Sequence, residues 1–451
     1  MNQQHDEHEP NRPGGRRVRS RWCAVGLAGV TGLALTTVGV AAAPAADAVE
    51  RIRASTDDRS GQPDRAAADS HSDNSKKHKG KKEERKGTPV PCDTDALIAA
   101  ITLANARGGA VLDLDKGCTY LLTADLDGTG LPAIATPITL NGGRKTTIKR
   151  AAAADPFRIL TVDTGGDLTV NRLKITGGRT DSDGGGIFVA PGGALTLKQS
   201  IITRNITSSF GGGIASEGTT HVHESEISHN TALAGGGISS RTVLVIKKSH
   251  INNNTVTFSG GGVASDGNTW VEHSSITFNQ SQARGGGGLE FSGTGTFIDS
   301  DISYNSAPFS AGGVSINPGA QLTFKSVSVI GNSATIGSGG GIQVEADSFF
   351  VTEDGVISKN TAATDGGGVN NLGNLTSRHT KITGNQADRG AGIFNLGTAS
   401  LFGTKVVKNV AVTNGGGIFN DTGTVNLNTA TGTVVVKNRP NNCVDVPGCA
   451  G

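Results

Sequence analysis

Short stretches of alternating apolar and polar residues recur along the chain from about residue 92 onward. Examples are residues 194–197 (Ala-Leu-Thr-Leu) and the more continuously apolar residues 243–246 (Val-Leu-Val-Ile). Alternation with a period of two and many β-branched side chains predict strands that bury one face. Glycine-rich turns separate these strands, and the repeats contain no stretch with a helical period.

A glycine motif that closes on an apolar residue occurs ten times at nearly constant spacing. Gly-Gly-Gly-Ile stands at 184–187 and at 415–418, with variants between them. The closing residues, 24–28 positions apart, are Ile187, Ile214, Ile238, Val263, Leu289, Val314, Ile342, Val369, Ile393 and Ile418. Such a period indicates stacked structural repeats.

A second motif, Ile/Val-x-x-Asn, precedes most of the glycine motifs. Its asparagines are Asn205, Asn230, Asn254, Asn279, Asn305, Asn332, Asn360, Asn385 and Asn409. Because each unit holds two or three short strands and no helix, each strand has to pair in parallel with its counterpart one period later. The predicted fold is therefore all-β: a right-handed single-stranded parallel β-helix (solenoid) with about 25 residues per coil.

Stacked coils predict that similar side chains recur in columns. The position two residues after each closing residue points inward and reads Ser216, Ser240, Ser265, Phe291, Ile316, Val344, Asn371, Asn395 and Asn420. Stacked Asn amides can donate to and accept from their neighbours. We expect the Ile/Val-x-x-Asn series to form a second ladder at a corner, where Asn tolerates left-handed backbone, and the glycines to mark another corner with positive φ.

The two ends of the repeat region carry closing devices. Residues 93–107 fit an amphipathic helix that would cover the first coil as an N-terminal helical cap. Cysteines form two local pairs, Cys92 with Cys118 and Cys443 with Cys449. In an exported chain we expect two disulfides; free thiols or a zinc site are the alternatives, although no ligand-spaced His accompanies the cysteines.

The chain divides into four segments. Residues 1–48 combine a basic cluster, an apolar stretch and small-residue cleavage sites, as in a signal peptide; an uncleaved membrane anchor is the alternative. Residues 49–91 have too few apolar residues to fold and are predicted to be a disordered charged linker. Residues 92–180 contain the cap and first coils, and residues 181–451 the repeat β-helix with its Cys-stapled C-terminal loop.

Composition and charge narrow the class of protein. Gly makes up 67 of 451 residues, with only 1 Met, 2 Trp and 2 Tyr, and the glycines lack the period of collagen. The net charge is +2, and the nearly neutral repeat body lacks a basic stripe for phosphate backbones, so no nucleic-acid partner is expected. We expect a secreted, extracellular monomer, released or retained at the cell surface, without membrane contact after signal cleavage.

Two resemblances follow from these motifs. Gly-Gly-Gly-Ile paired with Ile-x-x-Asn resembles the repeat of the polymorphic outer membrane proteins. The opening Cys-Asp-Thr-Asp-Ala-Leu-Ile-Ala-Ala-Ile at 92–101 resembles the CSLREA-type module of secreted bacterial β-helix proteins. Together they cover about 92–449 and imply an extracellular parallel β-helix of surface or adhesion type. The chain has no room after Ile418 for the membrane β-barrel of the polymorphic proteins.

Candidate catalytic groups are few. Polysaccharide lyases and hydrolases with this fold need clustered outward carboxylates. Asp125 with Asp127 fits a Ca²⁺ loop or a plain turn, and Glu353 with Asp354 is an acidic pair before a turn. Arg172 with Lys174 resembles the basic motif of polygalacturonases, but that family's other motifs are absent. We therefore predict no catalytic residue, no metal and no cofactor.

Other outward columns have both structural and functional interpretations. Glu217, Arg241 and Asp266 fit an ion ladder, and His221 with His223 fits a solvated strand face better than a metal site. Phe394 and Phe419 occupy the same outward position on adjacent coils and are the candidate binding residues, as a stacking patch for sugars; a covering loop is the alternative.

These residues favour a non-catalytic extracellular β-helix for surface binding, adhesion or envelope structure. The expected partners are cell-surface glycans, wall polymers, or surface proteins of host or neighbouring cells. A polysaccharide lyase or glycoside hydrolase is the alternative.

Overall fold

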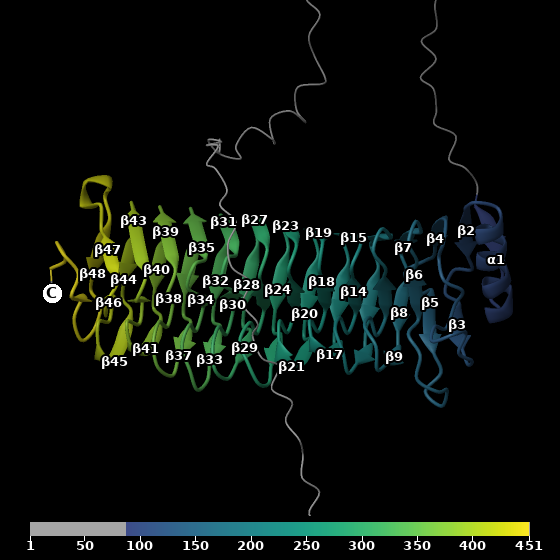
Figure 1. Cartoon of the computed structure of the whole chain (residues 1–451), viewed down its shortest axis with the longest axis horizontal. Coiled ribbons are helices and arrows are strands. Elements are labelled where there is room, and N and C mark those ends of the chain that lie inside the picture. Colours follow the sequence, from purple (N-terminus) through teal and green to yellow (C-terminus); the bar gives the residue numbers. More distant parts are fainter. Residues whose placement is uncertain (1–86, 451) are drawn as a thin grey trace, which may run out of the picture. The chain divides into compact units, whose positions relative to one another are not determined.

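The computed structural model describes residues 87–450, so the predicted signal peptide (1–48) and residues 49–86 of the predicted linker lie outside the described residues. The described residues form a parallel β-solenoid in which each strand pairs with its counterpart one coil later (Figure 1). Closing residues of the glycine motifs pair in register, Ile187 with Ile214 and Ile214 with Ile238. The predicted all-β parallel solenoid and its period are therefore confirmed.

A typical coil passes through four parallel sheets, which we number I to IV in chain order. Sheet I consists of β1 (Thr88–Val90), β2 (Ala110–Leu114), β4 (Pro137–Asn141), β7 (Asp167–Asn171), β11 (Ala194–Lys198), β15 (Thr219–His223), β19 (Val243–Lys247), β23 (Asn268–Glu272), β27 (Thr294–Ile298), β31 (Gln321–Lys325), β35 (Phe349–Glu353), β39 (Asn374–Arg378), β43 (Thr398–Phe402) and β47 (Thr424–Asn426). Sheet II consists of β3 (Thr119–Leu122), β5 (Thr147–Arg150), β8 (Lys174–Thr176), β12 (Ile201–Thr203), β16 (Glu226–Ser228), β20 (His250–Asn252), β24 (Ser275–Thr277), β28 (Asp301–Ser303), β32 (Ser328–Ile330), β36 (Val356–Ser358), β40 (Lys381–Thr383), β44 (Lys405–Val407) and β48 (Val434–Val436).

The other two sheets complete each coil. Sheet III consists of β9 (Arg179–Thr180), β13 (Ile206–Thr207), β17 (Thr231–Ala234), β21 (Thr255–Ser259), β25 (Gln280–Ser281), β29 (Ser306–Ala307), β33 (Ser333–Ala334), β37 (Thr361–Ala362), β41 (Gln386–Arg389) and β45 (Val410–Asn414). Sheet IV consists of β6 (Leu160–Val162), β10 (Ile187–Val189), β14 (Ile214–Ser216), β18 (Ile238–Ser240), β22 (Val263–Ser265), β26 (Leu289–Phe291), β30 (Val314–Ile316), β34 (Ile342–Val344), β38 (Val369–Asn371), β42 (Ile393–Asn395), β46 (Ile418–Asn420) and β49 (Cys443–Val444). A short 3₁₀ turn, η2 (Thr429–Thr431), lies between β47 and β48. The expectation of two or three strands per unit missed sheet III, many of whose strands have only two residues.

The predicted helical cap is present as α1 (Thr94–Ala106), at the β2 end of the solenoid (Figure 1). Asp93 caps it by accepting a hydrogen bond from the backbone N–H of Ala96 at 2.8 Å. Leu97, Ile101 and Ala104 are buried and join the solenoid core. The helix therefore covers apolar surface that the first coil would otherwise expose. In the part of the chain that the structure describes, no helix is long and apolar enough to cross a membrane.

The start of the solenoid corrects one predicted boundary. Residues 88–90, placed in the linker by the sequence, form β1 and pair with β2. Val90 is buried and lies opposite Leu114. Three residues are too few to show a strand period in the sequence. This strand is defined by its pairing with β2.

Both predicted cysteine pairs are disulfides in the structure. Cys92 is joined to Cys118, which links the segment before α1 to the turn before β3. Cys443 is joined to Cys449, which closes a short loop after the last coil.

The corner between sheets II and III contains the predicted asparagine ladder. Asn230 is fully buried, and its Nδ2 donates to Asn254 Oδ1 and to the Ile202 carbonyl, each at 3.0 Å. Equivalent side-chain bonds link Asn205, Asn230, Asn254, Asn279, Asn305, Asn332, Asn360, Asn385, Asn409 and Asn438. The expected left-handed backbone belongs to the residue before each Asn, such as His229 (φ 57°), and not to the Asn itself. The Asn side chain is thereby directed inward onto the ladder.

The glycine corner lies between sheets III and IV. The first glycine of each motif has positive φ, as in Gly211 at 71°, and Ala311 takes this place at 50° in one coil. A Cβ on the third glycine, Gly213, would lie 2.6 Å from the Gly237 carbonyl oxygen and 3.0 Å from Asn230 Nδ2. The third glycine is therefore required because the asparagine ladder packs against its backbone.

The inward column of sheet IV also follows the prediction. Asn371 Nδ2 donates to Asn395 Oδ1 at 2.7 Å, and Asn395 Nδ2 donates to Asn420 Oδ1 at 2.8 Å. Ser216, Ser240 and Ser265 are buried at the same inward position. A continuous apolar cluster runs inside the four sheets from Val90 to Val446.

Candidate functional site

The middle residue of each sheet IV strand from β10 to β46 points out of the solenoid, and we name this outward column, with the cleft that it contains, the sheet IV groove. Its floor residues, in register from coil to coil, are Phe188, Ala215, Ser239, Ala264, Glu290, Ser315, Gln343, Asn370, Phe394 and Phe419. Five of these ten residues are buried although they point outward, namely Ala215, Ser315, Gln343, Asn370 and Phe394. Arg241, which follows the sheet IV strand β18, reaches across this column. It pairs with Glu217 on its own side, and its guanidinium lies 5.6 Å from the ring centre of Phe210 on the other side.

Arginine covers an aromatic ring at each end of this column. The Arg158 guanidinium lies 5.0 Å from the ring centre of Phe188. At the other end, Arg389 lies 4.9 Å from the ring centre of Phe394 and 5.4 Å from that of Phe419. Cation–π contact of this kind fixes the side chains that close the groove.

The predicted binding pair is therefore stacked but covered. The rings of Phe394 and Phe419 are 5.4 Å apart and nearly parallel, at 9°. Phe394 is only 3% exposed, and Phe419 is half-buried. Two hydrogen bonds to Asp365, at 2.9 and 3.2 Å, anchor Arg389 above them. The pair is not an open platform for sugar, and the cover is an arginine rather than a loop.

Between these ends the groove deepens into a cleft of about 430 Å³ around Glu290. Its lining residues are Ala283, Arg284, Gly285, Glu290, Phe309, Ser310, Ser315, Asn317 and Glu345. Asn317 Nδ2 donates to Glu290 Oε1 at 2.8 Å and to Ser292 Oγ at 3.0 Å. Glu290 Oε2 is enclosed and has no hydrogen-bond partner among the described residues. A buried oxygen with a vacant lone pair is costly unless a ligand or water serves it.

The electrostatics of the cleft favour protonated carboxyl groups. Burial raises the pKa of Glu290, and the nearby charges of Glu345 and Asp266 raise it further, against the lowering effects of the polar side chains of Asn317 and Ser315. Burial also raises the pKa of Glu345. Two acids that hold their protons above the usual Glu range can donate hydrogen bonds or a proton inside the cleft.

Aromatic and amide groups flank these acids. Phe309 stands on the rim and is 56% exposed, while Arg284 lies 4.8 Å from the ring centre of Phe258. Next along the floor, Asn370 Nδ2 donates to Gln343 Oε1 at 2.7 Å. The cleft thus combines a flat apolar surface with hydrogen-bonding groups.

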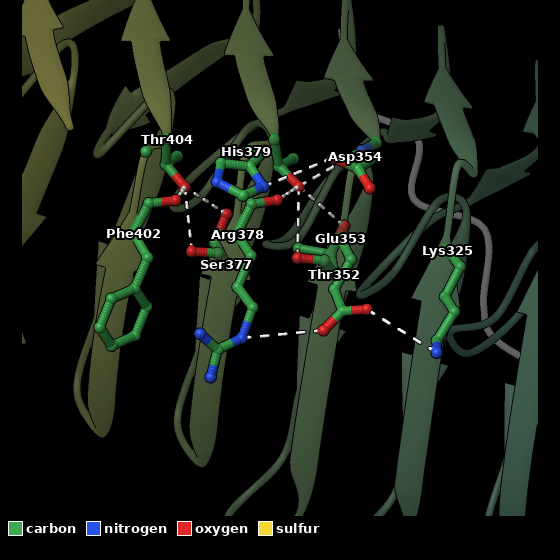
Figure 2. A network of polar contacts seen from close by, with 12 residues as sticks. Lys325, Thr352, Glu353, Asp354, Ser377, Arg378, His379, Phe402 and Thr404 are labelled. Atoms are coloured by element: carbon green, nitrogen blue, oxygen red, sulfur yellow. Dashed lines mark hydrogen bonds and ion pairs between the residues drawn. The ribbon is translucent and has the colours of Figure 1, made fainter. Parts of the chain in front are cut away.

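The predicted acidic pair Glu353–Asp354 lies elsewhere, on the outer face of sheet I and at its corner with sheet II (Figure 2). Glu353 sits between Lys325 at 3.9 Å and Arg378 at 3.7 Å, and Asp354 lies 3.5 Å from His379. Each carboxylate has a cationic or ionisable neighbour and solvent access. This arrangement is a surface ion ladder with no enclosed space for a substrate.

The other predicted candidates are also dispersed. Asp125 accepts a hydrogen bond from Gly128 N–H at 2.6 Å, as in a plain turn. His223 contacts the adjacent Glu224 at 3.8 Å, and His221 is exposed. Within residues 87–450, no group of three or more His, Cys, Asp or Glu side chains is arranged to hold a metal ion. Arg172 and Lys174 lie at the corner between sheets I and II, apart from the sheet IV groove.

Sequence reasoning missed Glu290 and one exposed aromatic pair. Glu290 is a glutamate in a column whose neighbours on adjacent coils are Ala264 and Ser315, and this departure from small residues is the available signal. Tyr304 stacks on Phe278 with ring centres 5.1 Å apart. Both rings are exposed at the corner between sheets II and III, where they precede ladder asparagines.

Comparison with known proteins does not place this chain in a family. No protein family and no curated protein matches this sequence. Among solved structures, the chain is similar to the A-module of the mannuronan C-5 epimerase AlgE6 of Azotobacter vinelandii, with 14% identity over 74% of this chain and 93% of that one, and a TM-score of 0.36.

Proposed function

We propose that this protein is an extracellular binding protein whose sheet IV groove holds a neutral or amino-sugar polysaccharide. The observation that carries this proposal is the Glu290 cleft, in which an exposed aromatic rim faces a floor of amide, hydroxyl and carboxyl groups. Sugars present apolar ring faces and rows of hydroxyls, so they need both kinds of surface. Secretion, expected from residues 1–48, would bring the groove into contact with such polymers.

The charge of the cleft selects among polysaccharides. Asp266, Glu290 and Glu345 are close enough to raise the pKa of Glu290. At a pH at which these groups are ionised, a polymer of uronic acids would add further negative charge to this region and would be repelled. Neutral hydroxyls or an amino group would instead satisfy the unpartnered Glu290 Oε2.

Cleavage of the bound polysaccharide is the second candidate function. The enclosed, proton-holding Glu290 favours it, because a general acid with a raised pKa can protonate a glycosidic oxygen. Glu345 would be the second carboxyl group of such a pair.

Incubation with a panel of defined oligosaccharides tests both candidates. The panel contains neutral glucans, chito-oligosaccharides and oligogalacturonates, and both affinity and polymer chain length are followed over time. We expect saturable binding of a neutral or amino sugar, weakened in E290Q and unchanged in E353Q, a glutamate of the surface ion ladder.

Three outcomes separate the candidates. Binding without shortening of the polymer supports the binding function. Shortening that E290Q abolishes supports cleavage. Tighter binding of oligogalacturonates to the wild-type chain than to E290Q in this groove would contradict the charge argument for both.

A further inference from the structure

We infer that a second, independent site for a linear acidic polysaccharide lies at the N-terminal end of the corner between sheets I and II. A groove of about 880 Å³ runs along this corner over several coils. The side chains that define it are Lys116, Arg144, Arg172, Lys174 and Lys248, with Gln199 between them. We name it the basic corner groove.

The groove exists because the first turns of this corner are longer than those that follow. Residues 115–118 and 142–146 connect sheets I and II in the first coils, whereas the next coils need only two residues, such as Arg172 and Leu173. A Cβ at Gly142 would lie 2.2 Å from Leu173 Cδ2, so glycine lets the long turn rest on the next coil. The long turns rise above the two-residue turns and carry Lys116 and Arg144 to one end of the groove.

The cations of this groove are not neutralised by the protein. Among residues 87–450, Lys116, Arg144, Lys174 and Lys248 form no ion pair. Arg172 gives its Nε–H to Gln199 Oε1 at 2.8 Å, which leaves its terminal nitrogens available. Two carboxylates, Glu224 and Glu226, oppose five cations in the lining, which leaves a positive excess.

The one carboxylate at the corner itself is bonded to Gln199. Gln199 Nε2 donates to Glu224 Oε2 at 2.8 Å. That hydrogen bond is the main reason why the pKa of Glu224 is lowered, with smaller contributions from His223 and Lys248. Gln199 therefore stands between Arg172 and Glu224. The N-terminal end of the groove, on the Arg172 side, has the stronger positive field.

The spacing of the charges points to the kind of polymer. Lys116, Arg144 and Arg172 belong to three successive coils, and successive coils are about 4.8 Å apart. A polysaccharide with one carboxylate or sulfate per sugar unit presents anions at a comparable interval. The groove lining contains no Phe, Tyr or Trp on which bases could stack, which favours an acidic polysaccharide over a single-stranded nucleic acid.

The test uses the full chain and two matched triple variants. R144Q/R172Q/K174S removes three groove cations; Gln199 and Ser275 already occupy the equivalents of Arg172 and Lys174, so the fold tolerates these changes. K381S/K405S/K408Q removes three cations from the C-terminal coils, two of them at the strand position of Lys174. Binding of oligogalacturonate and of dextran sulfate is measured by titration at several salt concentrations.

We expect the groove variant to bind both polymers ~10-fold or more weakly, with the slope of log affinity against log salt reduced by about two. The C-terminal variant should bind as the wild type does. A variant with Lys→Gln changes throughout residues 76–86, a Lys-rich part of the predicted linker (the tether variant), tests whether that segment supplies the affinity instead. Equal losses in both triple variants, loss only in the tether variant, or tighter binding of DNA than of either polysaccharide would each overturn the inference. Retention of polyanion binding by E290Q separates this site from the sheet IV groove.

Discussion

Glu290 and Glu353 are both outward-pointing glutamates on strands of the same solenoid, but their surroundings differ in every respect that decides a carboxylate's role. Glu353 lies on the open face of sheet I, between Lys325 and Arg378 (Figure 2). Glu290 lies at the bottom of a cleft on sheet IV, with one oxygen bonded to Asn317 and the other unpartnered.

The difference arises from the turns rather than from the strands. The corner between sheets I and II is formed by two-residue turns around Glu353, which leave that face exposed. On sheet IV, the cleft around Glu290 is lined by residues of the adjacent turns, such as Arg284, Phe309 and Asn317. Charge on an open face of a solenoid is therefore commonly structural, whereas the same charge between high turns is costly and indicates a function.

The largest expected effect on stability comes from a substitution in the solenoid interior, which supports both regions. Asn332→Ala would remove a fully buried amide that bonds to the Ile302 carbonyl, to Asn360 and to Asn305. We expect a loss of about 3 kcal/mol of unfolding free energy, because several buried partners become unsatisfied. Chemical denaturation measures this loss. Asn426→Ala, at an exposed position of sheet I, is the control and should change stability by less than about 0.5 kcal/mol.

The substitution Glu290→Gln should change how the unfolding free energy depends on pH. The pKa of Glu290 is raised in the folded state, so the folded protein holds a proton that the unfolded chain has released. Unfolding free energy therefore falls as pH rises from the ordinary Glu pKa through the raised one, and the substitution removes this fall. We expect E290Q to be about 1 kcal/mol more stable than the wild type at pH 7 and equal to it below pH ~4.

Thermal melting across this pH range measures the difference between E290Q and the wild type. A less stable E290Q at neutral pH would mean that the Glu290 carboxylate is well solvated or paired, and Glu290 would then resemble Glu353.

Phe309→Ala should weaken binding in the sheet IV groove without affecting the fold. The ring is 56% exposed on the rim of the cleft, so little core packing is lost. Removal of one stacking surface should cost about 1 kcal/mol of binding free energy. Calorimetric titration with the sugar selected by the panel gives this value. Phe349 is 52% exposed on sheet I, and Phe349→Ala should leave binding unchanged. Equal losses in both variants would contradict binding of the sugar in the cleft.

The smallest effect is expected for the ion ladder itself. Glu353→Gln should change unfolding free energy by no more than about 0.5 kcal/mol, because both of its ion pairs are longer than 3.5 Å and partly solvated. Melting in low and high salt would show little difference between the variant and the wild type. A loss above about 1 kcal/mol would show that the ladder is a cooperative network.

The sequence predicted the features that have a repeated or a local signal and missed those that have neither. The glycine corner, the asparagine ladder and the inward Asn371 column recur in register, so each coil confirms its neighbours. The helix at 94–106 and the two disulfides could be found because their signals are local. Sheet III was missed since a two-residue strand such as β13 has no period of its own.

The candidate site was not predictable in the same way. Phe394 was correctly placed on an outward position, but its burial depends on Arg389, which reaches over it from the neighbouring turn. Glu290 carries no motif, and its enclosure depends on residues such as Phe309 and Asn317 from the following coil. Local sequence indicates which side of a strand a residue occupies, but it does not indicate how high the adjacent turn stands.

The left-handed residue before each ladder asparagine has a further consequence for how such a protein can change. This position holds Arg204, His229, Phe278, Tyr304 and Lys359 in different coils, without any change of backbone. Its backbone geometry is set by the neighbouring Asn and not by its own side chain. One corner of the solenoid therefore offers a row of exposed positions, about 4.8 Å apart, at which cationic, aromatic and polar groups are interchangeable. A protein built in this way can acquire a new ligand preference by single substitutions along one edge, while the residues that determine its fold stay unchanged.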